Sequence, residues 1–349
     1  MLTLGIETSC DETSVSVTDE ARVLSNVVSS SVHLHKKYGG VVPEIASRLH
    51  VEYMIEVLSK ALEDSDKDLG DMKLIAVTNG PGLVGALLTG ISLAKSLGYS
   101  LKKPLVGVNH ILAHLYSSFL NERDRRPSFP FLGLVVSGGH TALFHCEDIG
   151  SQRLLGSTQD DAVGEAYDKV AKILGLGYPG GPVVDRSARL AKGGTKINFP
   201  KSYLGKDSLD FSFSGIKTAV LYYVNNLRRT QHAERTTKFS QTMINDICYS
   251  FQEAALDMLV EKVMRAVEVT KAKRIVVGGG VAANSRLREK MGRIASFSSM
   301  KIYFPELKYC MDNAAMIGYL GEALYKKGSR SDLYLSAEPN LASAGGLGT

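Results

Sequence analysis

One order of predicted elements occurs twice along the chain, and it constrains the fold more than any single motif. Each copy opens with two short strands joined by a polar or glycine-containing turn, within "LTLGIETSCDETSVSVTD" and within "PFLGLVVSGGHTALFHC". A third strand, a helix, a buried strand and a second helix follow in each copy. The copies share architecture but not residues. Two α/β halves of this kind usually form a cleft, and ligands tend to bind between them.

The repeat divides the 349 residues into two halves, in agreement with a length that exceeds one ordinary core. We expect residues 1–125 with 320–349 to form one half and residues 126–319 the other. Segment 195–237 lacks the repeating rhythm, so we predict an irregular insertion there. A helical pattern follows "GGVV", and proline predicts an interruption of that helix near Pro43.

Positive charge is concentrated in one part of the chain. Residues 151–300 hold 23 Lys and Arg against 14 Asp and Glu, although the net charge of the whole chain is only +5. Such a region is typical of proteins that bind an anionic partner, nucleic acid above all, but lysines that merely solvate helices give the same count. The candidate contacts are Arg228, Arg229, Arg235, Lys238, Arg286 and Arg288.

The sequence shows no pattern typical of a membrane span, a targeting leader or a paired-cysteine site. There is no apolar run of about 18 residues, and the chain begins without the pattern of a targeting leader. The four cysteines, Cys10, Cys146, Cys248 and Cys310, form no CxxC pair. These observations predict a reduced, cytoplasmic protein without a membrane span.

A histidine pair is the first candidate site. His110 and His114 are four residues apart in "NHILAH", so a helix that Asn109 caps would place both on one face. The pair follows a buried strand, where α/β proteins bind ligands. Asp312 can supply a third ligand or cap the next helix instead. Two histidines and a carboxylate suit zinc or iron(II), whereas a zinc protease carries glutamate where this chain has Ile111.

Glycine-rich turns and clustered polar residues mark further candidate positions. "VSGGHT" joins two predicted strands, and "VVGGGVAAN" links a buried strand to a helix, so both let backbone N–H groups approach an anion or a flat ring. "GYPGGP" is a third glycine cluster. "ETSCDETSV" forms a polar hairpin tip, and "GEAYDK" places Glu165 and Asp168 on one helix face. Each stretch also has a plain structural explanation as a turn or a solvated face.

Taken together, ten of these stretches match one family in order. They are "GIETSCDETSV", "GGVVPEIASRLH", "TNGPGLVGAL", "GVNHILAH", "LVVSGGHT", "DDAVGEAYDKVAK", "GLGYPGGP", "FSFSGIKTAV", "VVGGGVAANSRLR" and "CMDNAAMIG", between residue 5 and about residue 318. The chain resembles the bacterial tRNA N6-adenosine threonylcarbamoyltransferase (TsaD) family, once described as glycoproteases. The resemblance implies an α/β actin-like ATPase (ASKHA) fold of two duplicated ribonuclease-H-like halves around a cleft.

The resemblance also implies site residues. One Fe(2+) or Zn(2+) ion per subunit would be held by His110, His114 and Asp312, and Asp11 and Glu12 would lie near the reacting end of the substrate. The substrate itself would contact Val135, Val136, Ser137, Gly138, Gly139, Asp168, Gly181, Asp185 and Asn284. Kinases of this fold carry aspartates where this chain has Glu7 and Val136, which argues against ATP hydrolysis. Archaeal and eukaryotic relatives often have a tyrosine ligand in place of Val135.

The implied reaction transfers the threonylcarbamoyl group of threonylcarbamoyl-AMP to the exocyclic amine of the adenosine 3′ of the anticodon in ANN-decoding tRNAs. The implied partners are tRNA, the paralogous subunit TsaB and the ATPase subunit TsaE, with no membrane. The apolar helix "LVGALLTGISLAKSLG" is either a docking face or a core helix. Rival interpretations are a metalloprotease, which a casein digest would reveal, a non-catalytic scaffold without metal ligands, and a sugar kinase.

Overall fold

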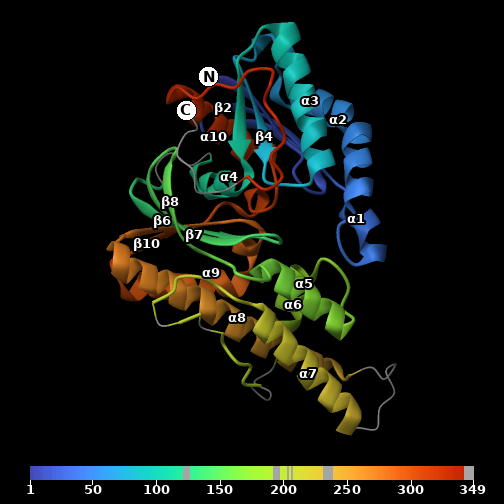
Figure 1. Ribbon diagram of the computed structural model, residues 1–349, viewed down its shortest axis with the longest axis vertical. Coiled ribbons are helices and arrows are strands. Elements are labelled where there is room, and N and C mark those ends of the chain that lie inside the picture. Colours follow the sequence, from blue (N-terminus) through green and yellow to red (C-terminus); the bar gives the residue numbers. More distant parts are fainter. Residues whose placement is uncertain (121–125, 192–196, 203, 206, 231–238, 342–349) are drawn as a thin grey trace.

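Two five-stranded sheets with the same topology build the protein (Figure 1). The computed structural model describes residues 1–349 except 121–125, 192–196, 203, 206, 231–238 and 342–349. The first sheet has the order β3-β2-β1-β4-β5, and the second has the order β10-β9-β6-β7-β8. In each sheet an antiparallel hairpin precedes two strands that run parallel to the first one. The predicted duplication is therefore present in the strand order.

The elements of the first half are as follows. Its strands are β1 (Leu2–Glu7), β2 (Glu12–Asp19), β3 (Arg22–Ser30), β4 (Leu74–Gly80) and β5 (Leu105–Asn109). Its helices are α1 (Val32–His35), η1 (Lys36–Tyr38), α2 (Pro43–Ser65), η2 (Leu69–Asp71), α3 (Val84–Leu101), α4 (His110–Tyr116) and η3 (Ser117–Phe119).

The second half and the last helix complete the described structure. Its strands are β6 (Phe131–Val136), β7 (Thr141–Asp148), β8 (Ser151–Ser157), β9 (Arg274–Gly278) and β10 (Lys301–Tyr303). The helices are α5 (Val163–Leu174), α6 (Gly180–Arg189), α7 (Ser214–Thr230), α8 (Gln241–Thr270), η5 (Gly280–Ala283), α9 (Ser285–Phe297), η6 (Leu307–Tyr309) and α10 (Ala314–Lys326).

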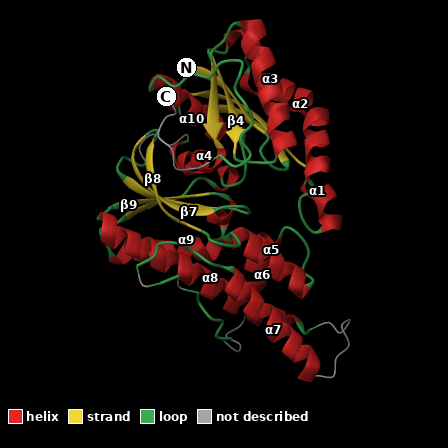
Figure 2. Cartoon of the chain, viewed as in Figure 1, coloured by secondary structure: helices red, strands yellow, loops and turns green. Residues whose placement is uncertain are grey.

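Helices cover the sheets because successive strand residues face opposite sides. In β1, Leu4 and Ile6 pack with the buried residues of α2 and α3, whereas Gly5 faces α10 on the other side. A Cβ atom on Gly5 would lie 2.3 Å from the Ala314 carbonyl oxygen, so glycine lets α10 pack directly on the sheet. Figure 2 shows α2 and α3 together on one side of the first sheet and α8 and α9 against the second.

Helix α4 lies between the two halves and joins their cores. Val106 of β5, Leu115 of α4 and Val135 of β6 belong to one buried apolar cluster that also includes α10 residues. The outer face of the second sheet packs separately, with Val136 among the residues buried against α5 and α8. The two sheets thus share an apolar core through α4, which fixes the ends of their strands relative to each other.

Three sequence-based expectations need revision. Pro43 does not interrupt a helix but begins α2, because a proline at the first helical position lacks only an N–H that would be unpaired anyway. The insertion expected at 195–237 contains the regular helix α7, whose start is held by Asp160: its carboxylate accepts from Ser212, Phe213 and Ser214. The proposed boundary at 319/320 falls inside α10, and all of this helix packs with the first sheet.

Helix α3 is long and apolar enough to cross a membrane by length and composition alone. Its inner face packs on the first sheet through small and aliphatic residues such as Ala86, Ile91 and Ala94. Only 33% of its residues are buried, however, and Val84 and Leu88 are 56% and 49% exposed. An outward apolar face on a packed helix is typical of a protein contact surface.

Candidate functional site

The carboxyl ends of four strands converge beside helix α4. Glu7 ends β1, His110 follows β5, Ser137 follows β6 and Gly279 follows β9. The Asn109 side chain caps α4 by accepting a hydrogen bond from the Leu112 N–H at 3.1 Å, as the sequence predicted. This junction of the two halves therefore collects the motifs that the sequence singled out.

His110, His114 and Asp312 form a compact cluster. One ligand atom from each lies within 4.8 Å of the others, and Asp312 Oδ1 is 3.2 Å from His114 Nε2 and 3.7 Å from His110 Nε2. Asp312 does not cap α10, because Asn313 accepts from the Met316 N–H instead. The Asp312 carboxylate is thus free to act as a ligand.

Glu7 supports the histidine pair from behind, a role that the sequence-based reasoning missed. Its fully buried carboxylate lies 2.9 Å from His110 Nδ1 and also accepts from the Ser9 N–H and the Thr78 hydroxyl, at 2.5 and 2.7 Å. A carboxylate only accepts, so His110 Nδ1 carries a proton, and Nε2 is the nitrogen that faces Asp312. A carboxylate–histidine pair of this kind orients many metal-binding imidazoles.

The charges of the cluster fit a bound cation. Burial by itself lowers the pKa of His110, but the negative charges of Glu7 and Asp312 outweigh it and raise that pKa to about 9. Burial likewise raises the pKa of Asp312, but His110 and His114 outweigh it and lower that pKa. The buried ring nitrogens of His114 find no hydrogen-bond partner of good geometry among the described residues. Two imidazoles and one carboxylate, with the His114 nitrogens still open to a ligand, suit a divalent transition metal.

The turn between β6 and β7 leaves two backbone amides open. Ser137 and His140 close the turn through Ser137 N–H to His140 O, at 2.8 Å, and His140 N–H to Ser137 Oγ, at 3.1 Å. Gly138 and Gly139 are exposed, a Cβ on either would meet nothing within 4 Å, and their N–H groups have no acceptor among the described residues. Such a turn can receive an anion. Val135 and Val136 are fully buried, so only their backbone could reach a ligand.

His140 is a second residue that sequence reasoning overlooked, although it lies within the "VSGGHT" motif. Burial, and then the positive charges of His110 and His114, lower the pKa of His140 to about 4. The ring is therefore neutral at physiological pH. Gly278 packs on the His114 carbonyl and Gly279 on the carbonyl of Val136, so the glycine turn that follows Val136 lies near the metal-ligand cluster.

The "GGG" turn after β9 is explained mainly by close packing. A Cβ on Gly278 would lie 2.3 Å from the His114 carbonyl oxygen, and one on Gly279 would lie 2.4 Å from that of Val136. Gly279 also has φ +94°, which favours glycine. These contacts let α4 and β6 approach β9, so the first two glycines position the histidines instead of making room for a flat ring.

Asp11 and Glu12 lie at the start of β2 and face the second half. Asp11 Oδ2 is buried without a hydrogen-bond partner among the described residues. Burial, then Asp312 and Asp11, raise the pKa of Glu12 well above its usual range. In the other half, burial raises the pKa of Asp168 and of Tyr178, and the negative charge of Asp11 adds to both shifts. The first half's carboxylates thus share one site with the second half.

Two buried histidines hold the Asp11 turn. Thr13 Oγ1 is 2.8 Å from His50 Nδ1, and His50 Nε2 donates to the Cys10 carbonyl oxygen at 3.0 Å. On the other side, Ser31 donates to the Asp11 carbonyl oxygen from both N–H and hydroxyl, at 3.1 and 2.8 Å, and His35 Nε2 lies 3.1 Å from the same hydroxyl. Residues 31–50 therefore fix the backbone on both sides of Asp11.

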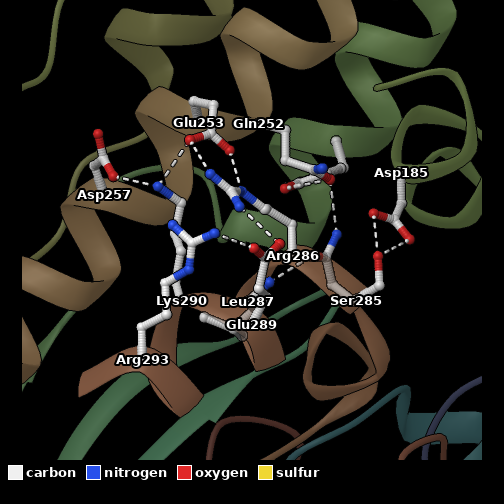
Figure 3. A network of polar contacts seen from close by, with 12 residues as sticks. Asp185, Gln252, Glu253, Asp257, Ser285, Arg286, Leu287, Glu289, Lys290 and Arg293 are labelled. Atoms are coloured by element: carbon white, nitrogen blue, oxygen red, sulfur yellow. Dashed lines mark hydrogen bonds and ion pairs between the residues drawn. The ribbon is translucent and has the colours of Figure 1, made fainter. Parts of the chain in front are cut away.

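The residues expected near the nucleotide are already engaged with other protein groups. Asp168 accepts from the Gly180 N–H at 2.6 Å and so holds the start of α6, where Gly181 faces open space. Asp185 accepts from the Ser285 hydroxyl (Figure 3). Asn284 caps α9 and donates to Gln252. In the structure these side chains link α5, α6, α8 and α9 to one another.

The candidate nucleic-acid contacts on α9 are occupied as well. Arg286 is paired with Glu253 at 2.6 and 2.9 Å and with Glu289 at 2.7 Å (Figure 3). Arg288 donates to the backbone oxygens of Ala282 and Pro305. Both side chains therefore hold α9 in place. Arg228 stacks on Phe239, and Arg235 and Lys238 lie outside the described residues.

Comparison with known proteins identifies the relatives of this chain. Residues 22–319 match the sequence profile described as "TsaD: tRNA N6-adenosine threonylcarbamoyltransferase". Proteins of that name are 49% identical in Dictyoglomus turgidum and 50% identical in Thermodesulfovibrio yellowstonii. The first alignment covers 98% of both chains, and the second covers 98% of this chain and 99% of the relative.

Solved structures with low sequence identity share the fold. The (R)-2-hydroxyglutaryl-CoA dehydratase component A of Acidaminococcus fermentans superimposes with TM-score 0.51 at 14% identity, over 94% of this chain and 98% of that one. Full-length HypF gives TM-score 0.60 at 13% identity, over 94% of this chain and 47% of that one. These are proteins of the actin-like ATPase type, so the predicted fold class is confirmed.

Replacing the buried carboxylate behind His110 tests its support of the metal site. Glu7→Gln keeps a similar shape but removes the charge that fixes the His110 proton on Nδ1. We expect affinity for Zn2+ or Fe2+ to fall by about 10- to 100-fold, measured by competition with a chelator. Glu322→Gln is the control, because Glu322 is also buried but binds the N-terminus. Equal metal affinity in Glu7→Gln and wild type would contradict this role.

The neutral His50 predicts loss of stability in acid. Burial lowers the pKa of His50 below its ordinary value of 6.5. Below that value the unfolded chain binds a proton that the folded chain does not, so the free energy of unfolding decreases as pH falls. His50→Gln does not titrate and keeps a donor for the Cys10 carbonyl. We expect its urea-unfolding free energy to depend less on pH between about 7 and 5.

The exposed His33 provides the control for that measurement. His33→Gln should retain the pH dependence of the wild type. If His50→Gln retained it too, another group would be responsible for the acid sensitivity.

Proposed function

We propose a specific reaction for this chain, which belongs to the tRNA N6-adenosine threonylcarbamoyltransferase (TsaD) family. Members of this family are transferases that take part in the threonylcarbamoyladenosine modification of tRNA. The enzyme moves the threonylcarbamoyl group from threonylcarbamoyl-AMP to the exocyclic amine of the adenosine 3′ of the anticodon in ANN-decoding tRNAs. The observation that carries the proposal is the cluster of His110, His114 and Asp312 beside an open glycine turn.

The chemistry is an acyl transfer in which one bond forms and one breaks. The adenine amine nitrogen bonds to the carbamoyl carbon, the bond from that carbon to the AMP phosphate oxygen breaks, and the amine loses a proton. An exocyclic adenine amine is a poor nucleophile, so most of the acceleration comes from orienting the two substrates and stabilising the leaving phosphate.

His110, His114 and Asp312 would hold one Fe2+ or Zn2+ ion, and Glu7 would fix the orientation of His110. When bound, such an ion supplies a Lewis acid and an anchor for oxygen ligands. No glutamate follows His110, in keeping with a reaction in which no water is activated. The same absence disfavours the metalloprotease alternative.

The remaining residues of the junction fit the other parts of the substrate. The Gly138 and Gly139 amides are free to donate to the phosphate. Asp11, with an unpaired buried oxygen, and Glu12 are placed to accept the amine proton or to orient the amine. Asp168, Gly181, Asp185 and Asn284 shape the nucleotide end through the helices that they join, and Val135 and Val136 contribute backbone only.

The protein works with other subunits in this proposal. A TsaB-type paralogue would bind the outer face of α2 and α3, where Val51 and Ile55 are 65% and 64% exposed and Leu88 is 49% exposed. This apolar face and the sparse burial of α3 support a protein partner there. A TsaE-type ATPase would join the assembly, and the site of action would be the cytoplasm.

Removal of both helix histidines tests the function. We expect His110→Ala/His114→Ala to lose bound metal and threonylcarbamoyl transfer together, because two of three ligands are gone. Metal content is measured beside transfer to unmodified tRNA with threonine, bicarbonate, ATP, the synthase and the partner subunits. His33→Ala, which removes an exposed histidine, should retain both. If threonylcarbamoyl transfer persisted without bound metal, the metal-dependent mechanism would be wrong. Cleavage of casein by the purified protein would support the metalloprotease alternative.

A charge placed on the α2–α3 face tests the partner. Ile55→Lys puts an ammonium group in the middle of the proposed apolar interface, so affinity for the paralogous subunit should fall by at least about 30-fold, the effect of losing a central interface residue. Val269→Lys on α8 is the matched control, since Val269 is 67% exposed. Isothermal titration calorimetry measures the affinity of both variants for the paralogous subunit. An unchanged affinity in Ile55→Lys would rule out this face as the interface.

A further inference from the structure

Unpaired cations from both halves meet at the edge of the site. Lys36 and Lys37 are exposed on η1 of the first half, and Lys172 is exposed on α5 of the second. Lys172 Nζ would lie 3.8 Å from a Cβ atom on Gly39, so the two halves approach each other at this point. Within the described residues none of the three lysines has an ion-pair partner. We call Lys36, Lys37, Tyr38 and Lys172 the lysine–tyrosine rim.

Several other cations of the second half differ from this rim because carboxylates pair with them. Lys169 is paired with Asp161 and Glu165, Arg286 with Glu253, and Lys290 with Asp257. The overall positive charge of residues 151–300 therefore overstates what is available to a polyanion. The position of unpaired cations, and not their number, indicates where one would bind.

The rim is connected to the Asp11 turn through the backbone. Lys36 directly follows His35, whose ring contacts the Ser31 hydroxyl at 3.1 Å, and that hydroxyl donates to the Asp11 carbonyl oxygen at 2.8 Å. The segment that carries η1 is thus tied directly to the backbone of Asp11. The edge of the junction carries exposed lysines, so a phosphate backbone is attracted there.

The rim also has an exposed aromatic ring. Tyr38 is 52% exposed, and Lys37 Nζ lies 4.9 Å from its ring centroid. Lysines that contact phosphates beside an aromatic ring that stacks on a base are the combination found where proteins bind single-stranded nucleic acid. A flat protein surface would not use the ring in this way, and a duplex would not offer it an unstacked base.

From these observations we infer that the lysine–tyrosine rim binds the single-stranded anticodon loop of the RNA substrate, with Lys36, Lys37 and Lys172 on phosphates and Tyr38 stacked on a base that flanks the target adenosine. This inference rests on the proposed function, because it assumes that an RNA loop reaches the junction. It assigns positions outside the metal-ligand cluster and the glycine turns.

Binding of a labelled anticodon stem–loop to the full-length protein tests the assignment. Affinity is measured by fluorescence anisotropy between about 50 and 200 mM salt, the range in which phosphate contacts are strongly screened. Lys36→Ala/Lys37→Ala should weaken binding and lower the slope of log affinity against log salt by about 1 to 2, and Lys172→Ala should lower it by about 1.

Tyr38→Ala separates stacking from charge. It should weaken binding by about 5- to 150-fold, the effect of losing one stacked base, with an unchanged salt slope. Tyr38→Phe should bind as the wild type does. The control is Lys273→Ala/Lys301→Ala, which removes two exposed lysines at the amino-terminal ends of the parallel strands β9 and β10, away from the carboxyl ends that form the junction, and should change neither affinity nor slope.

The outcomes distinguish the inference from the proposed function. If the rim variants keep wild-type affinity and slope, or if the Lys273/Lys301 control loses as much as they do, the rim is not the binding surface, even when wild-type protein modifies tRNA normally. The rim variants could instead lose binding as expected while the wild type transfers no threonylcarbamoyl group to tRNA with all components present. In that case the proposed reaction would be wrong, but the rim would still be an RNA-binding surface.

Discussion

The site depends on the close approach of helix α4 to strand β9. Gly278 allows it, since a Cβ atom there would lie 2.3 Å from the His114 carbonyl oxygen, and Gly133 of β6 similarly leaves room for Leu115. The helix is thereby held between the two sheets inside one apolar core. Because the histidines lie on this short helix, their position follows from packing that involves both halves.

A second approach brings the acidic ligand to the same place. Gly5 lets α10 pack on β1, and Asp312 directly precedes Asn313, the N-cap of that helix. Asn313 takes the capping role, which leaves the Asp312 carboxylate to face the histidines. Glu7, at the end of the strand on which α10 packs, completes the set from the other side of His110. Backbone packing and buried charge therefore act together: glycine contacts set the distances, and opposite charges make the arrangement favourable for a cation.

The electrostatics of the junction change from its interior to its edge. Inside, Glu7, Asp11, Glu12 and Asp312 lie close enough to shift one another's pKa values or those of neighbouring histidines and cysteines. At the edge, unpaired lysines from η1 and α5 face solvent. A substrate with a negatively charged backbone and a neutral reacting base matches this order, because the base enters while its phosphates stay outside.

Local patterns explain why much of the fold was predictable. The strand–turn–strand openings, the Asn109 cap and the four-residue spacing of the histidines each depend on neighbours close in sequence, and the structure has them where the sequence predicted. The prediction that Pro43 interrupts a helix failed because the same residue type is tolerated at a first turn. Helix α7 was missed because its start is held by Asp160, a residue 54 positions away from Ser214.

The sequence by itself determined the duplicated α/β halves, the family and the identity of the metal-ligand candidates, because periodicity and motifs are local properties of the chain. Only the tertiary structure decided which charges are free. Glu7 supports His110 across 103 residues, and Glu253 neutralises Arg286 across 33, whereas Lys36, Lys37 and Lys172 have no ion-pair partner in the described part of the chain. No local pattern distinguishes these cases, since the free energy of a charge depends on what the fold places beside it.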